Sequence, residues 1–262
     1  GEKNTHRWLL VPGWNTNIEY TVGDYGFEMP TDEKCSAGES RMMVSVHYYD
    51  PWDYCGIEDL KTILWGEYGD NLIEVNGFPK MNKAKWGDES YLDDLFSRMQ
   101  EKFVKNDIPV IIGEYGCIDK SSAYADFAGQ IQGNRAYWDG YVAGKAASMG
   151  MIPVYWDNGF NGVYGFGLFD RNTYEQTQPE IISTILKAVK NKDPKAGLDT
   201  VVENKAEKTD DAHAYIGIQT EVYTFRNTCS DAKYGKDTDY FNTLIKWGED
   251  DQIIDTGAKF TD

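Results

Sequence analysis

A single carboxylate, Glu114, stands at the end of a short apolar run and is the side chain in this sequence best placed for chemistry. The run from Val110 to Ile112 is bounded by Pro109 and Gly113, which predicts a strand buried on both faces of a parallel sheet. In open α/β sheets and (β/α) barrels, the carboxyl ends of such strands form the mouth where substrates bind. The alternative is a structural glutamate, held at its strand end by backbone amides or by a lysine.

Polar and aromatic side chains follow the other predicted strands in the same way. A carboxylate can attack carbon, a histidine and a tyrosine can orient it, and a tryptophan can stack on a sugar ring. Four strand ends of this kind favour an active site over chance, although a histidine alone is more often an ordinary core or loop residue. These strand-end residues are Asn15 and Asn17 after the first strand, His47 and Tyr49 after the second, and Trp156 and Asn158 after the fourth.

The elements that would position these groups alternate along the chain. Strands are predicted at residues 7–12, 41–47, 108–112 and 151–156, and amphipathic helices at residues 89–103, 134–149 and 180–189. Asp88 can cap the first helix, residues 20–40 form an irregular connection, and residues 54–87 form a long loop. This order predicts an α/β fold with a parallel sheet and helical crossovers, with four of the eight units that close a (β/α)₈ barrel.

Composition narrows the classes of function. The chain has 43 acidic and 26 basic residues and a net charge of -17, so it repels nucleic acid and anionic lipid, and neither is expected as a partner. No apolar run reaches the roughly 20 residues that span a bilayer. Aromatic residues make up 14% of the chain, which suits stacking on neutral sugars. The four cysteines lack metal-binding spacing, so neither a metal nor another cofactor is expected.

Two cysteines and three tryptophans each allow two interpretations. Cys35 and Cys55 either form a loop disulfide, if the protein is secreted, or remain buried thiols. Trp52, Trp65 and Trp86 lie in predicted loops, where they either line a cleft or simply cover the mouth of the fold.

The C-terminal region is expected to be separate from the α/β part. Residues 191–211 are rich in charged side chains and nearly free of aromatics, which predicts a linker, and residues 214–225 alternate as one or two strands. The predicted organisation is an α/β domain at 1–190, a linker at 191–212 and a partial β-rich accessory module at 213–262. The chain begins Gly1-Glu-Lys without an initiator Met or a signal peptide, so a processed or truncated N-terminus is expected.

Three motifs in one order resemble glycoside hydrolase family 5, and within it the bacterial endo-β-1,4-glucanases and xyloglucanases. They are Val-Ser-Val-His-Tyr-Tyr-Asp-Pro-Trp at 44–52, Ile-Ile-Gly-Glu-Tyr-Gly at 111–116 and Pro-Val-Tyr-Trp-Asp-Asn-Gly at 153–159. The resemblance implies that Glu114 is the catalytic nucleophile after the seventh strand. It also implies that His47 and Tyr49 are the His-x-Tyr pair of the sixth strand, and that Trp156 is the sugar platform of the eighth.

The resemblance covers about residues 7–190 and is incomplete. The family's acid/base glutamate lies in an Asn-Glu dipeptide after the fourth strand, and this sequence contains no such dipeptide. The chain is therefore expected to be the C-terminal half of the barrel, strands five to eight. Its open edges and apolar concave face need cover from a second copy, a missing polypeptide or the C-terminal tail, and a homodimer that completes the barrel is favoured.

The expected activity is that of a retaining endo-β-1,4-glucanase acting on β-glucans such as carboxymethyl cellulose, mixed-linkage glucan or xyloglucan. The expected location is extracellular or periplasmic. The alternative is a catalytically impaired half-barrel, or a fragment of a longer modular enzyme, that binds β-glucan through its aromatic residues. Expected substrate contacts are Trp156, Asn158, Asn15, Asn17 and Trp52.

Overall fold

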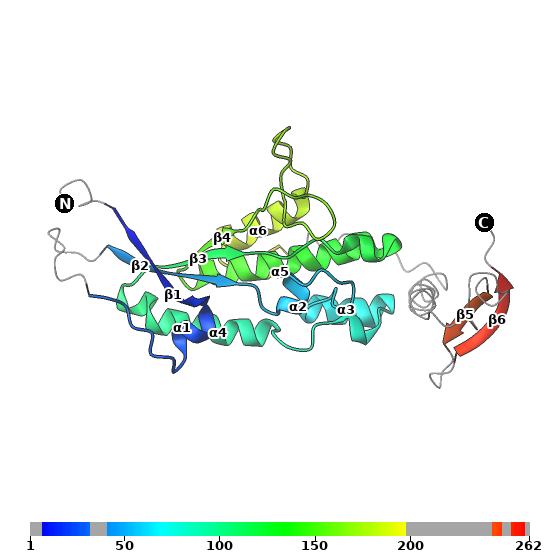
Figure 1. Cartoon of the computed structure of the whole chain (residues 1–262), viewed down its shortest axis with the longest axis horizontal. Coiled ribbons are helices and arrows are strands. Elements are labelled where there is room, and N and C mark those ends of the chain that lie inside the picture. Colours follow the sequence, from blue (N-terminus) through cyan, green and yellow to red (C-terminus); the bar gives the residue numbers. More distant parts are fainter. Residues whose placement is uncertain (1–6, 32–40, 198–242, 248–252, 260–262) are drawn as a thin grey trace.

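The computed structural model describes residues 7–31, 41–197, 243–247 and 253–259. Its larger sheet has four parallel strands that lie side by side in the order of the sequence (Figure 1). They are β1 (Leu9–Asn17), β2 (Met42–Tyr48), β3 (Val110–Tyr115) and β4 (Ile152–Tyr155). The predicted α/β fold with a parallel sheet is confirmed.

The helices of this part of the chain pack against one another, and α1 and α5 also contact the sheet. They are α1 (Ile18–Val22), α2 (Trp52–Cys55), α3 (Gly66–Asn76), α4 (Glu89–Lys102), α5 (Ala128–Ser148) and α6 (Pro179–Asn191). The long helix α5 contacts α3, α4, α6, β3 and β4 and forms the centre of this layer. Its Trp138 is fully buried and stacks on Tyr48 of β2, with ring centroids 5.9 Å apart.

Helix α4 begins where the sequence predicts. The Asp88 side chain accepts a hydrogen bond from the backbone N–H of Tyr91 and so caps the first turn. Leu92, Phe96 and Met99 recur at helical spacing and are buried against the sheet. Helix α5 begins six residues earlier than predicted, at Ala128 instead of Asn134, in a segment where Gly129 and Gly133 weaken the sequence signal.

The prediction of a long loop over residues 54–87 is wrong, because this segment contains α3. The start of α3 is anchored by the buried side chain of Asn134 in α5, a contact that the local sequence does not show. Nδ2 of Asn134 donates to the carbonyl of Trp65 at 2.8 Å, and Oδ1 of Asn134 accepts from the backbone N–H of Trp65 at 2.7 Å. Trp65 is fully buried directly before the helix, so it covers the core and lines no cleft.

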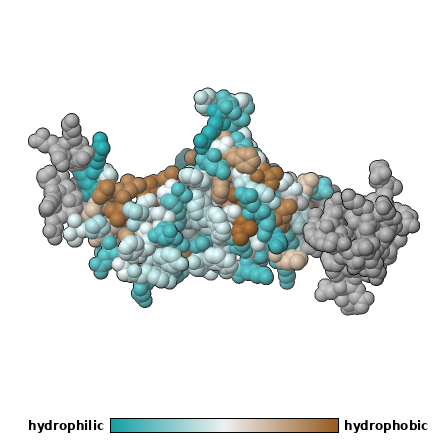
Figure 2. Space-filling view, in the orientation of Figure 1, coloured by the Kyte–Doolittle hydropathy of each residue, from teal (hydrophilic) through white to brown (hydrophobic). Residues whose placement is uncertain are grey.

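The two faces of the sheet differ in burial. On β2, Val44, Val46 and Tyr48 face the helices and are buried, whereas the alternate side chains are partly exposed. Apolar side chains on the outer strands remain exposed: Leu9 at 60%, Leu10 at 48%, Ile152 at 49% and Val154 at 41%. Figure 2 shows brown, apolar surface over the strands at the left of the view. Within the described residues, β1 and β4 each pair with one neighbour only, so both edges of this sheet are open.

A second, two-stranded sheet occurs near the C-terminus. Strands β5 (Thr243–Trp247) and β6 (Ile253–Lys259) pair in antiparallel fashion. The strands predicted at 214–225, and most of the predicted linker at 191–212, lie outside the described residues.

A buried carboxyl on α5, that of Asp139, makes the stability of the fold depend on pH. Asp139 is fully buried with its Oδ2 3.9 Å from Nε of Arg135. Burial raises the pKa of the Asp139 carboxyl from 3.8 to about 8, against the opposing effect of Arg135. Because the folded-state pKa is the higher one, the stabilising contribution of this group is fully present below about pH 4. It is lost as the pH rises through about 8.

We therefore expect the melting temperature to fall by a few degrees between pH 6.5 and pH 9, and Asp139→Asn to flatten this dependence because the amide mimics the protonated acid. Thermal denaturation followed by circular dichroism measures both profiles. Exposed Asp126 provides the matched control, and Asp126→Asn should keep the parent slope. An unchanged slope in Asp139→Asn would contradict the assignment.

Candidate active site

The structure brings three of the predicted site residues into direct contact. The phenol of Tyr49 donates a hydrogen bond to Oε2 of Glu114 at 3.0 Å. Nδ1 of His47 lies 3.3 Å from the same oxygen, and the side chains of His47 and Glu114 are each 29% exposed. One carboxylate oxygen therefore has two neighbours, and the cluster lies at the carboxyl ends of β2 and β3, open to approach from the mouth.

A β-bulge at Gly113 aims Glu114 at His47. Strict alternation would place residue 114 on the helix-facing side with Val110 and Ile112. The pairing shifts instead: Ile112 pairs with Val46, and the next pair is Glu114 with His47, so Gly113 is the extra residue. Glycine suits this position because an added Cβ would lie 3.0 Å from Oγ of Ser45, a tight contact.

Two aromatic rings hold the phenol of Tyr49 in place. Trp52 and Phe166 both meet the Tyr49 ring edge-on, with centroids 5.9 and 6.0 Å away. Burial, together with the hydrogen bond to Glu114 and the negative charge of Glu114, raises the pKa of Tyr49 far above its usual value of 10. Tyr49 therefore stays protonated and remains a hydrogen-bond donor to Glu114 across the neutral and mildly alkaline range.

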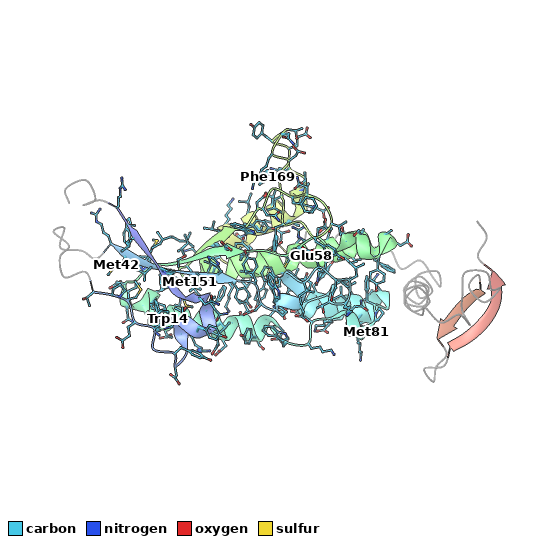
Figure 3. All side chains as sticks on the ribbon, viewed as in Figure 1. Trp14, Met42, Glu58, Met81, Met151 and Phe169 are labelled. Atoms are coloured by element: carbon cyan, nitrogen blue, oxygen red, sulfur yellow. The ribbon has the colours of Figure 1, made fainter. Side chains whose placement is uncertain are left out.

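Trp156 follows β4, with its backbone N–H bonded to the carbonyl of Tyr115 at 2.9 Å and its side chain 43% exposed. Beyond it, a loop projects from the sheet between β4 and α6 and carries Phe169 (Figures 1 and 3). Asn158 shapes this loop, because its Oδ1 accepts from the backbone N–H groups of Phe160 at 3.0 Å and Phe166 at 3.3 Å.

The two predicted asparagines lie in the last part of β1, where Asn17 pairs with His47 across the sheet, and the hydrogen bonds of both asparagines are local. Asn17 caps α1, where its Oδ1 accepts from the backbone N–H of Tyr20 at 3.0 Å. Asn15 is exposed and has a positive φ of 52°, and its carbonyl accepts from the hydroxyl of Thr16. Trp14, also in β1, lies beside α1 (Figure 3).

The sequence analysis did not identify the residues that hold the loop around Phe166 in place. The phenol of Tyr155 donates to the carbonyl of Phe166 at 2.9 Å and accepts from Nη2 of buried Arg135 at 3.1 Å. These contacts hold the backbone of Phe166, whose ring packs on Tyr49. No sequence signal pointed to Phe166, since it lies in a glycine-rich loop far along the chain from Tyr49.

Among the described residues, no group of three or more His, Cys, Asp or Glu side chains could hold a metal ion. In the same part of the chain, no helix is both long and apolar enough to cross a membrane.

Comparisons with known proteins agree with the motifs. The model of the cellulase family, glycosyl hydrolase family 5, matches residues 2–162. Endoglucanase A of Paenibacillus barcinonensis is 44% identical over 193 residues, which cover 72% of this chain and 45% of the relative. A xyloglucan-specific endo-beta-1,4-glucanase of Bacteroides ovatus is 28% identical and is covered over 34% of its length.

Solved structures give the same result. A family 5 xyloglucanase from Paenibacillus pabuli is 45% identical with a TM-score of 0.64, over 72% of this chain and 50% of that one. A broad-specificity endoglucanase from Bacteroides salanitronis is 34% identical with a TM-score of 0.59, over 71% of this chain and 45% of that one. The chain spans about half the length of these relatives. On the match of the family model, this chain belongs to glycosyl hydrolase family 5.

Proposed function

We propose that this chain supplies the nucleophilic half of a retaining endo-β-1,4-glucanase. The observation that carries the proposal is the contact of Glu114 with Tyr49 and His47 at the mouth of a parallel sheet. A carboxylate whose oxygen is held by a phenol and an imidazole is aimed, partly exposed and able to attack an anomeric carbon. The endoglucanases and xyloglucanases among the relatives favour a β-1,4-glucan as the substrate.

In this mechanism the ionised carboxylate of Glu114 forms a bond to the anomeric carbon while the bond to the leaving sugar oxygen breaks. Water later attacks the glycosyl-enzyme and releases Glu114 with net retention. Tyr49 holds one oxygen of Glu114, which leaves the other free to attack. Trp156 and Trp52 are the proposed sugar platforms. The local bonds of Asn17 and Asn158 favour structural roles for both.

Retention needs a second carboxyl about 5–5.5 Å from the nucleophile. The family's Asn-Glu motif is missing from the sequence, so the sequence identifies no acid/base. We propose that the chain is the C-terminal half of a (β/α)₈ barrel and that a second copy covers its open edges. With both halves aligned parallel, the partner's copy of the same glutamate would lie at the same mouth, and like-charge proximity would raise one of the two carboxyl pKa values.

A second candidate function is binding of β-glucan without hydrolysis. Loss of general acid help costs about 10²- to 10⁴-fold in rate, whereas stacking of sugars on exposed tryptophans does not need it. Trp156 and Trp52, 43% and 51% exposed, favour this alternative if the chain acts alone.

The role of Glu114 can be tested without an acid/base. A 2,4-dinitrophenyl β-cellobioside has a leaving group that needs no protonation, so we expect it to transfer cellobiosyl to Glu114 of the native chain. Intact-mass and peptide mass spectrometry would detect the adduct. Glu114→Gln should abolish labelling, and Glu74→Gln, a change at an exposed residue of α3, should not. No labelling of a folded chain that is still retarded in β-glucan gels would favour the binding function.

The hydrogen bond from Tyr49 to Glu114 predicts a loss of rate in Tyr49→Phe. A hydrogen bond to a charged group contributes about 1.5–3 kcal/mol, so glycosyl-enzyme formation should slow by about 10- to 100-fold. Stopped-flow release of dinitrophenolate measures the rate. Glucan retardation in gels should change little, and Tyr174→Phe, on an 85% exposed residue, is the matched control. Equal rates in both variants would contradict the role of Tyr49.

Closure of the barrel by a second copy predicts a dimer in solution. Light scattering should give about twice the 29.8 kDa of one chain. Leu10→Lys and Val154→Lys place charges on the open face and should shift the mass toward one chain, with circular dichroism as the check on folding. A single-chain mass across a wide concentration range would rule out the dimer and favour a different polypeptide as the cover.

A further inference from the structure

Two cysteine side chains face each other beneath the mouth of the sheet. Sγ of Cys117 lies 3.7 Å from Sγ of Cys55, and both residues are buried. Cys117 follows Glu114 by three residues, and Cys55 ends α2, which begins directly after the segment that carries His47 and Tyr49. The pair therefore joins the two segments whose contact makes the candidate active site.

The backbones around the pair are already held together. The N–H of Ile118 donates to the carbonyl of Cys55 at 3.0 Å. Next to it, Nζ of buried Lys120 donates to the carbonyls of Asp53 at 2.8 Å and Thr62 at 2.9 Å. These bonds keep the two segments, and with them the two sulfurs, close together.

From this geometry we infer that Cys55 and Cys117 form a disulfide under oxidising conditions, a cross-link that ties the nucleophile's loop to α2. This pairing differs from the one the sequence left open, between Cys35 and Cys55. It does not depend on the proposed hydrolase activity.

The reaction is thiol–disulfide exchange with a small-molecule disulfide such as oxidised glutathione. One cysteine thiolate attacks a sulfur of the small disulfide and releases one small thiol, leaving a mixed disulfide. The second cysteine thiolate attacks the cysteine sulfur of that mixed disulfide and releases the other small thiol. The two protons leave the cysteine thiols, and the small disulfide takes up the two electrons.

Burial makes the timing of this reaction predictable. Desolvation raises the pKa of both thiols, so few thiolates exist once the chain has folded. The cross-link is therefore expected to form while the chain folds, or during slow local opening, and to resist reduction afterwards. It would act as a permanent brace under the mouth.

The experiment refolds the full chain in a mixture of reduced and oxidised glutathione and maps its disulfides by mass spectrometry. We expect a cross-linked peptide pair that contains Cys55 and Cys117. A variant with Cys35→Ser and Cys229→Ser leaves only this pair. Its mass should fall by the two hydrogens lost, and alkylation under denaturing conditions should find no thiol.

The same variant provides a stability readout. A disulfide that closes a loop between residues 62 apart should raise the melting temperature of the oxidised form by about 5–10 °C over the reduced form. Adding Cys55→Ser and Cys117→Ser should remove this difference. Two free thiols after oxidative refolding to a native circular dichroism spectrum, or a Cys35–Cys55 link in the full chain, would overturn the inference.

Discussion

The candidate active site depends on how β3 pairs with β2. The bulge at Gly113 moves Glu114 from the helix-facing side of the sheet to the side of His47, and the absence of a side chain at Gly113 lets β3 approach Ser45 closely. Without this shift, the carboxylate would point into the apolar helix layer, where an ionised group is strongly disfavoured. One extra residue in one strand thus decides whether the Glu114 carboxylate lies beside His47 at the carboxyl ends of the strands.

Beneath that pairing, α5 supports the loops that surround the site. Asn134 anchors the start of α3, and Arg135 holds Tyr155, whose phenol fixes the backbone of Phe166. Phe166 in turn packs on Tyr49, the donor to Glu114. Polar side chains buried on a helix are costly unless they are paired, and the amide of Asn134 and Nη2 of Arg135 find their partners in segments next to the site. The core of this protein therefore also determines the geometry of its mouth.

Both edges of the four-stranded sheet are open within the described residues. Its outer strands expose leucine, isoleucine and valine side chains on the face away from the helices, and each has a free edge within the described residues. The chain matches about half the length of its family 5 relatives. A parallel sheet normally has both faces covered, and among the described residues one face and both edges of this sheet are not.

Local sequence determined the parts of this protein that depend on neighbouring residues. The apolar run before Glu114, the spacing of Leu92, Phe96 and Met99, and the cap at Asp88 predicted a strand and a helix that the structure contains. The sequence motifs also indicated the family and brought Glu114, His47 and Tyr49 into one hypothesis. Helix α3 was missed because its anchor, Asn134, lies far along the chain. Only the tertiary structure decided the bulge at Gly113, the contact of Phe166 with Tyr49 and the proximity of Cys55 to Cys117. Each of these joins segments far apart in sequence, and the spacing of residues along one segment carries no information about which other segment will pack against it.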